Sequence, residues 1–456
     1  MNRDFWYSIA DSRRLRDSRK AEHNDRRSAF DMDHDRIMYS NFFRRMHDKT
    51  QVFPYAPLSS SGQARSRLSH SLEVSCVGRS LGNLLGHHLA EKGVRINPYD
   101  IGTIVATACL AHDIGNPPFG HSGEYAIQEW ITRNLDGVLE DEWEKSDLSL
   151  FEGNAQGFRI LTRLETWERA GGLRPTIATL CAFTKYPCSS MSAVRNGDDQ
   201  THKKHGFFKS DRHLFAETFS HAGQECFEEN CHSFHRHPLA FLAEAADDIC
   251  YAVVDLEDAY HLGIIPFDDV FRLLHPVALA GSEYSDDSVY DTDIRVARLR
   301  SASISSLISL VIDAVTENLI SMEDGTLTEP VISRTAVAPF YREIQKYSLK
   351  NIYNSTRVLE IESAGYRTIG GLLSLFIPAV LAQKPSPQEK VLRRLIPYRF
   401  FKRHEITGTS QEPDELIKHL SDYEKILSVT DYISGMTDRY AVELYQRLSG
   451  IKLPMY

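Results

Sequence analysis

The chain has few cysteines, no long apolar run and no apolar N-terminal segment. Its seven cysteines among 456 residues form no regular framework, which argues against a disulfide-stapled secreted domain and is typical of a reducing compartment. The first 27 residues are highly charged and do not resemble a signal peptide. The longest apolar runs, at residues 307–315 and 376–382, are too short to cross a bilayer. We therefore expect a soluble, cytoplasmic protein that does not enter a membrane.

Strand patterns, internal repeats and clear domain linkers are also scarce. Apolar residues recur mainly at helical spacing, which predicts an all-α fold. With 42% hydrophobic residues, the chain can bury a sizeable core.

Positive charge is not in excess. The net charge of −10 argues against a protein dedicated to coating DNA. A basic segment at residues 13–27 could contact nucleic acid or polyphosphate, although a solvated helical arm is the simpler interpretation. A negative net charge is nevertheless compatible with a local cluster of basic residues at one site.

Chemistry-bearing residues gather at residues 111–124. The side chains that can bind a metal or move a proton are His112, Asp113, His121 and Glu124, with Asn116 between them. A buried helix at about residues 100–110 leads into this stretch, and Gly and Pro residues end it. His112 and Asp113 are therefore expected in the last helical turn, at the rim of a core. A lone His-Asp pair is more often a satisfied polar contact than a ligand set, so partners are needed.

Two further helices offer those partners. His70 opens an amphipathic helix, and Asp247 stands on a second helix that begins at Pro238. Glu244 and Tyr251 share the face of Asp247 at helical spacing. The simpler interpretation is that Glu244 and Asp247 lie on a solvated, acidic helix face. The Ala-rich, apolar surroundings make a buried functional carboxylate at least as good an interpretation.

The ordered set His70, His112-Asp113 and Asp247 resembles that of the HD-domain metal phosphohydrolases, and within them the deoxyguanosine triphosphate triphosphohydrolases (dGTPases). Further blocks of the chain resemble the same family: residues 49–54 (KTQVFP), 151–157 (FEGNAQG), 184–187 (TKYP), 244–249 (EAADDI) and 435–440 (GMTDRY). The resemblance covers most of the chain. It implies an N-terminal helical arm with the QVFP loop at 1–55, an HD core at 56–275, and a helical C-terminal extension at 276–456 that completes the site.

Two His and two Asp side chains suit a divalent ion. Mg²⁺ and Mn²⁺ are the first choices, and Fe or Zn also fit the mixed ligands. The reaction that the resemblance implies is hydrolysis of a dNTP, with dGTP preferred, to a deoxynucleoside and tripolyphosphate. His121 is then the general acid/base and Glu124 its orienting carboxylate, although a Glu in a first helical turn is also common as a cap.

A triphosphate needs cations and polar groups around it. The residues that the resemblance assigns to phosphate are Arg67, Asn154, Lys185, Lys204 and Arg439. Tyr251 would pack under the sugar and exclude a 2′-hydroxyl, and Gln51 would read the sugar or the base. Ser69 and Cys188 depart from the family pattern, which leaves the nucleotide preference open.

Several alternatives remain at this stage. Another HD-type phosphohydrolase or phosphodiesterase is one, and a catalytically silent regulator that responds to nucleotide or single-stranded DNA is another. Cys226, Cys231 and neighbouring His residues loosely resemble a zinc knuckle, but their spacing misses the tighter motifs. The resemblance also suggests a homo-oligomer, with a hexamer among the candidates, and single-stranded DNA or a second dNTP as effector.

Overall fold

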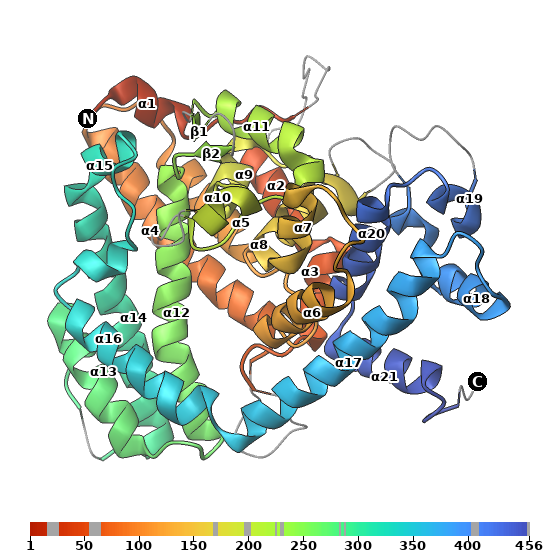
Figure 1. Ribbon diagram of the computed structural model, residues 1–456. Coiled ribbons are helices and arrows are strands. Elements are labelled where there is room, and N and C mark those ends of the chain that lie inside the picture. Colours follow the sequence, from red (N-terminus) through yellow and green to blue (C-terminus); the bar gives the residue numbers. More distant parts are fainter. Residues whose placement is uncertain are drawn as a thin grey trace.

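The computed structural model describes residues 1–15, 27–53, 65–166, 172–195, 202–223, 226–228, 232–281, 284–286, 289–402 and 410–453. Over these residues the fold is almost entirely helical (Figure 1). The strands within them are β1 (Cys226–Glu228) and β2 (Ser233–Phe234), which pair antiparallel. The expected all-α class is confirmed.

The first half of the chain carries the elements that surround residues 111–124. Its helices are α1 (Arg3–Ser8), α2 (Ala29–Met38), α3 (Asn41–Arg45), α4 (Arg67–Glu91), α5 (Pro98–Ala111), α6 (His121–Asn134), α7 (Glu142–Ser149), α8 (Gly153–Arg159), α9 (Ile177–Phe183), α10 (Ser190–Arg195) and α11 (Arg212–His221).

The second half begins with the long helix α12. Its helices are α12 (Pro238–His261), α13 (Phe267–Gly281), α14 (Thr292–Glu317), α15 (Leu319–Glu323), α16 (Ala338–Ser348), α17 (Thr356–Leu381), α18 (Pro387–Leu395), α19 (Pro413–Ile417), α20 (Asp422–Ser434) and α21 (Asp438–Leu448). A turn of π-helix, η6 (Leu349–Tyr353), joins α16 to α17.

Helices α4, α5 and α12 form the centre of the fold, and their starts follow from local sequence. The Ser66 side chain caps α4, and α5 and α12 each have Pro at their first position, where its missing N–H costs nothing. Helices α4 and α5 pack backbone to backbone, since a Cβ at Gly82 would lie 2.8 Å from the Gly102 Cα. This close approach brings the helix that carries His70 next to the helix that ends at His112.

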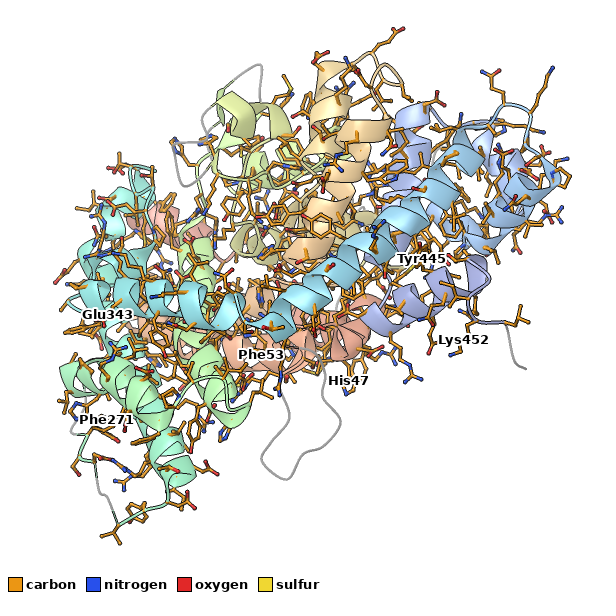
Figure 2. All side chains as sticks on the ribbon, turned by 60° about the horizontal axis from the view of Figure 1, so that its bottom comes forward. His47, Phe53, Phe271, Glu343, Tyr445 and Lys452 are labelled. Atoms are coloured by element: carbon orange, nitrogen blue, oxygen red, sulfur yellow. The ribbon has the colours of Figure 1, made fainter. Side chains whose placement is uncertain are left out.

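The C-terminal elements flank this centre on two sides. Helices α13 to α16 pack beside α12, whereas α18 to α21 lie at the opposite end of the molecule, and α17 spans the distance between them (Figure 1). Figure 2 shows α17 crossing the front, with Tyr445 of α21 beside it. That ring lies against Gly371 of α17, where a Cβ would meet it at 2.2 Å.

Two helices, α14 and α17, are long and apolar enough to cross a membrane by length and composition alone. This is weak support for a membrane span, because core helices of soluble proteins pass the same test. Both pack on neighbouring helices, α14 on α13 and α17 on α6 and α20.

The polar composition of residues 188–210 is typical of a long loop, yet Ser190–Arg195 forms α10. The Ser190 hydroxyl donates to the buried Asp147 carboxylate at 2.6 Å and fixes the start of this helix. Residues 196–201 of the same segment lie outside the described part of the chain.

Candidate functional site

Three helices bring a set of metal-binding side chains together. His70, His112 and Asp247 each offer one ligand atom, and these atoms all lie within 4.8 Å of one another. The Asp247 Oδ1 atom is 3.0 Å from His70 Nε2 and 3.5 Å from His112 Nε2. Two imidazoles and a carboxylate around one point are a donor set that fits a divalent cation. Among the described residues, this is the one group of this kind.

The ring of His112 is already oriented for such a role. Its Nδ1 atom lies 2.6 Å from the Cys109 carbonyl oxygen, so Nδ1 carries the proton and Nε2 keeps a free lone pair. Burial opposes the charged form of His70, but its hydrogen bond to Asp247 raises the pKa of the imidazole.

Asp113 lies beside this set and is held by two donors. Its Oδ2 atom is 3.6 Å from His112 Nε2 and accepts from the Arg67 guanidinium at 2.5 Å. Its Oδ1 atom accepts from Asn116 Nδ2 at 2.6 Å. Burial favours the neutral acid, but the positive charge of Arg67 outweighs it and lowers the pKa of Asp113 to about 2. The carboxylate is therefore charged and available to a cation at neutral pH.

His121 and Glu124 form a second group at the start of α6. His121 Nδ1 lies 2.8 Å from Glu124 Oε2, and the other Glu124 oxygen accepts from the Gly153 N–H at 2.8 Å. A Cβ at Gly153 would lie 2.6 Å from that oxygen, so a glycine is required for this contact. The Glu124 carboxylate is buried, while the His121 side chain is 66% exposed. Glu124 thus fixes the imidazole through Nδ1 and leaves Nε2 free for a ligand.

Arg67 joins the two groups. Its Nη1 atom donates to Asp113, and a Cβ on Gly120, the residue before His121, would lie 2.1 Å from its Nη2 atom. The guanidinium therefore lies between the metal-binding set and the His121 turn. Its Nε atom is buried without a hydrogen-bond partner.

Glu152 is a carboxylate that the sequence analysis did not single out. It is buried, and it accepts from Lys204 Nζ at 3.0 Å and from Asn154 Nδ2 at 2.8 Å. Lys204 also lies 3.7 Å from Glu124. Burial and the nearby Glu124 carboxylate raise the pKa of Glu152. Two of the residues assigned to phosphate are thus held by one acid next to the His121–Glu124 pair.

Lys185 is held in a similar way by Glu244 on α12. The Lys185 Nζ atom is 3.2 Å from Glu244 Oε1, and Arg236 donates to the other oxygen at 2.6 Å. Burial opposes the charged ammonium, but Glu244 outweighs it and raises the pKa of Lys185. Since Glu244 is one helical turn before Asp247, Lys185 lies near the metal-binding set.

Gln51 and Tyr251 lie on elements that flank this centre. Backbone pairing of Thr50 with Ser66 places Gln51 next to the start of α4, and its side-chain oxygen is buried without a partner. The Tyr251 ring stacks on Tyr353 with centroids 5.5 Å apart. The Tyr353 hydroxyl donates to Asp255 at 2.7 Å. The Tyr251 ring is therefore fixed one turn after Asp247.

Arg439 is not brought together with these residues. Its side chain is 78% exposed, and its guanidinium pairs with Glu443 on the same helix at 3.1 Å. At the first turn of α21, it is the neighbouring Asp438 that contacts the segment before His121, through a 2.9 Å bond from Phe119 N–H.

The zinc-knuckle interpretation of the cysteine cluster falls partly outside the described residues, because Cys231 is not among them. Of its histidines, His237 caps α12 by accepting from the Leu239 N–H at 3.3 Å. His232 stacks on Trp143 at 5.4 Å. Both rings have a structural role in this arrangement.

The contacts of Glu152, Asp438 and Lys49 were hard to identify from sequence. Glu152 stands inside the quoted block 151–157, and Asp438 inside 435–440, so the blocks were a signal for the segments but not for these roles. Lys49, likewise inside a quoted block, is buried and donates to the carbonyls of Asn116 and Ser434. The partners of Asp438 and Lys49 lie far away in the sequence, and so does Lys204, one of the two partners of Glu152.

Comparisons with known proteins show which family this chain resembles. The HD domain model matches residues 67–152, and a phosphohydrolase-associated domain model matches residues 381–447. A deoxyguanosinetriphosphate triphosphohydrolase-like protein of Synechocystis is 41% identical over 98% of this chain and 100% of its own length. A protein of the same description from Pseudomonas aeruginosa is 37% identical over 94% of this chain and 95% of its own. A deoxyguanosinetriphosphate triphosphohydrolase of Yersinia enterocolitica is 29% identical over 92% of this chain and 93% of its own.

Proposed function

Because the chain belongs to the deoxyguanosinetriphosphate triphosphohydrolase-like family of HD-domain phosphohydrolases, we propose that it hydrolyses a dNTP, dGTP first, to a deoxynucleoside and tripolyphosphate. The observation that carries this proposal is the convergence of His70, His112 and Asp247 beside an oriented His121–Glu124 pair. Arg67 lies between the two groups. A reacting phosphate can therefore contact both.

His70, His112, Asp113 and Asp247 would hold a divalent ion, Mg²⁺ or Mn²⁺ before Fe or Zn. Such an ion supplies a Lewis acid for a phosphate oxygen when bound. Asp113 and Asp247 contribute negative charge, since the pKa of each is held below its usual value although burial opposes this. The pair of imidazoles contributes neutral nitrogen ligands once His70 has lost its proton.

Hydrolysis at the α-phosphorus joins a water oxygen to that phosphorus and breaks the bond to the 5′-oxygen of the sugar. The tripolyphosphate leaves intact, and the 5′-oxygen must gain a proton. His121 is suited to supply that proton from Nε2, because Glu124 holds its other nitrogen and so orients the ring. Its exposed ring is free to reach a bound ligand.

Three cations are placed to meet the triphosphate. Arg67, Lys185 and Lys204 are each held by a carboxylate, at Asp113, Glu244 and Glu152. Asn154 would add an amide donor on the Glu152 side. Arg439 could contact the triphosphate only after moving away from Glu443, so we expect it to contribute least to triphosphate binding.

Selection of a deoxyribose is proposed for Tyr251. Its stack on Tyr353 fixes the ring, so it cannot turn aside for a 2′-hydroxyl. Gln51 brings an unpaired amide oxygen, which would accept from the sugar or the base. The preference for guanine over the other bases is the most specific element of this proposal.

We also propose that the protein acts in the cytoplasm as a homo-oligomer, a hexamer among the candidates, with single-stranded DNA or a second dNTP as effector. The support for the oligomer is the resemblance to the family. Light scattering after gel filtration measures the mass, and a monomer at micromolar concentration would contradict this proposal.

Product analysis by ion-exchange chromatography tests the reaction. The full chain with Mn²⁺ or Mg²⁺ is given each dNTP and GTP separately, beside the His121→Ala variant. We expect deoxyguanosine and tripolyphosphate from dGTP, much less product from GTP, and loss of product in the variant. Monophosphate with pyrophosphate would indicate a different HD phosphohydrolase. No product, even with mixed dNTPs and single-stranded DNA present, would favour a regulator.

A further inference from the structure

The carboxylate of Asp438 accepts two backbone hydrogen bonds from segments that are far apart in the sequence. Its Oδ2 atom accepts from the Thr50 N–H at 2.8 Å, and its Oδ1 atom accepts from the Phe119 N–H at 2.9 Å. Thr50 precedes Gln51, and Phe119 is two residues before His121. One side chain of the C-terminal extension thus holds the segments that carry both residues.

The segment at Phe119 needs such support. Phe119 has a φ of +64°, a left-handed conformation that costs a residue with a Cβ about 1 kcal/mol or more. The next residue, Gly120, caps α6 without any side-chain hydrogen bond. The Phe119 ring lies against α17, since a Cβ at Gly365 would be 2.8 Å from its Cγ. The turn into His121 is therefore shaped by Asp438 on one side and by α17 on the other.

Two basic residues strengthen the same meeting point. Lys49 is 3% exposed, and its ammonium donates to the carbonyl oxygens of Asn116 at 2.6 Å and Ser434 at 2.8 Å. Arg45 donates to the Gly435 carbonyl at 2.8 Å. Residues 45–50, 116–119 and 434–438 are thus bonded to one another pairwise, and we name them the three-segment junction. Figure 2 shows His47, which belongs to its first segment, and Phe53, which follows that segment, beneath α17.

We propose that Asp438 is a positioning residue that fixes Gln51 and His121 relative to each other through the three-segment junction. The inference rests on the proposed function for the roles of those two residues, whereas the contacts of Asp438 can be tested without substrate. A loosened junction would move the general acid and the sugar- or base-facing amide together. Both kcat and KM for dGTP should then depend on Asp438, although it touches no substrate.

Hydrogen exchange followed by mass spectrometry tests this in the full chain. An Asp438→Asn side chain keeps one oxygen but turns an NH₂ group toward the second N–H, so one of the two bonds is lost. We expect peptides that contain Thr50 or Phe119 to exchange at least tenfold faster in this variant, while peptides of α12 exchange as in the wild type. The matched control is Asp422→Asn, an exposed acid of the same extension that pairs with Lys425 at 2.7 Å. It should leave all these peptides unchanged.

Wild-type exchange at both segments in Asp438→Asn would overturn the proposal. If exchange in Asp438→Asn rises throughout the chain, the Asp438→Glu variant is used as the test instead. The added methylene shifts the carboxylate so that it cannot accept both N–H groups at once. Faster exchange confined to the two segments supports the inference, and wild-type exchange in that variant overturns it.

Turnover gives a second readout where the wild type is active. We expect kcat/KM for dGTP to fall 10- to 100-fold in Asp438→Asn, with a rise in KM as well as a loss of kcat, and with bound Mn²⁺ unchanged. An inactive wild type would refute the proposed function but leave the exchange result valid. The two failures are therefore distinguishable.

Discussion

The residues at the proposed metal centre and those proposed to face the substrate are supported in different ways. His70 and Asp247 stand inside helices of more than twenty residues, and His112 ends a third helix packed closely on the first. Lys185, Lys204 and Gln51 lie instead in segments between helices. Lys185 and Lys204 are held by the buried carboxylates of Glu244 and Glu152.

The two regions are therefore held rigid by different interactions. Helix packing brings His70, His112 and Asp247 together, so the geometry of the proposed metal centre is largely built before any ion arrives. The substrate-facing side depends on ion pairs and on backbone hydrogen bonds between distant segments. We propose that those acids keep the cations in place until a triphosphate displaces part of the pairing. Changes at the metal centre should therefore act through metal loss, and changes on the other side through substrate binding.

The largest effect is expected for Asp247→Asn. Asp247 contacts both imidazoles, and a neutral amide is a poor replacement for a carboxylate ligand. We expect loss of stoichiometric Mn²⁺, measured by elemental analysis, and a fall in turnover of roughly 10³-fold or more. The exposed Asp268→Asn serves as the control. If Asp247→Asn keeps its metal and most of its activity, Asp247 is not a ligand of the metal centre. The contrast between the metal centre and the substrate-facing side would then fail.

His121→Gln should give the next largest effect. Without a proton donor at the leaving oxygen, kcat is expected to fall about 10²- to 10⁴-fold. Metal content should stay at the wild-type level, because His121 is not part of the set around Asp247. Parallel measurement of kcat and bound Mn²⁺ checks both points. Loss of metal in His121→Gln would show that His121 contributes to metal binding. The metal centre and the substrate-facing side would then not be functionally separate.

Glu152→Gln sharpens the comparison on the substrate-facing side. The amide weakens the hold on Lys204 and Asn154, and a net loss of about 1.4 kcal/mol in binding corresponds to a tenfold change. We therefore expect KM for the triphosphate to rise about tenfold while kcat changes less. Steady-state kinetics at saturating Mn²⁺ measures this split. A change confined to kcat would instead assign Glu152 to the chemical step.

The smallest effect concerns stability and pH at Lys49. Burial lowers the pKa of this ammonium to about 7, although Asp438 opposes the shift. Between about pH 7 and the unfolded value near 10.5, the unfolded chain then binds more protons than the folded one. Stability contributed by the wild-type lysine must therefore rise with pH in this window, by at most about 1.4 kcal/mol per pH unit.

Urea unfolding of the wild type and Lys49→Met at pH 7.5 and pH 9 checks that sign. The variant leaves two buried carbonyls without their donor, so it should be less stable at both pH values. Its deficit should grow at the higher pH. A deficit that shrinks or stays constant would show that Lys49 remains charged in the folded protein.

The sequence was most informative where function depends on helices. The apolar spacing around His70 and Asp247, and the Pro and Gly residues that end the helix before Asp113, predicted three helices that the structure contains. The spacing of His121 and Glu124 predicted a pair that the structure places at 2.8 Å. These are local patterns within a few helical turns, so the sequence carries them directly.

The junctions between distant segments were not predictable in the same way. The bonds of Asp438 to Thr50 and Phe119 span 388 and 319 residues, and no local spacing indicates them. Arg439 was assigned to phosphate by its motif, yet α21 turns it toward Glu443 and presents its neighbour Asp438 to Phe119. Which residue of a motif faces the site depends on packing between helices, and a single sequence does not state that packing.

The most direct measurement of the central claim is hydrolysis of dGTP in H₂¹⁸O by the Mn²⁺-loaded protein, with mass spectrometry of both products. Attack on the α-phosphorus at the centre formed by His70, His112, Asp113 and Asp247 predicts one ¹⁸O atom in tripolyphosphate and none in deoxyguanosine. Label in the 5′-hydroxyl of deoxyguanosine, or a labelled monophosphate with pyrophosphate, would contradict the proposed reaction at this centre.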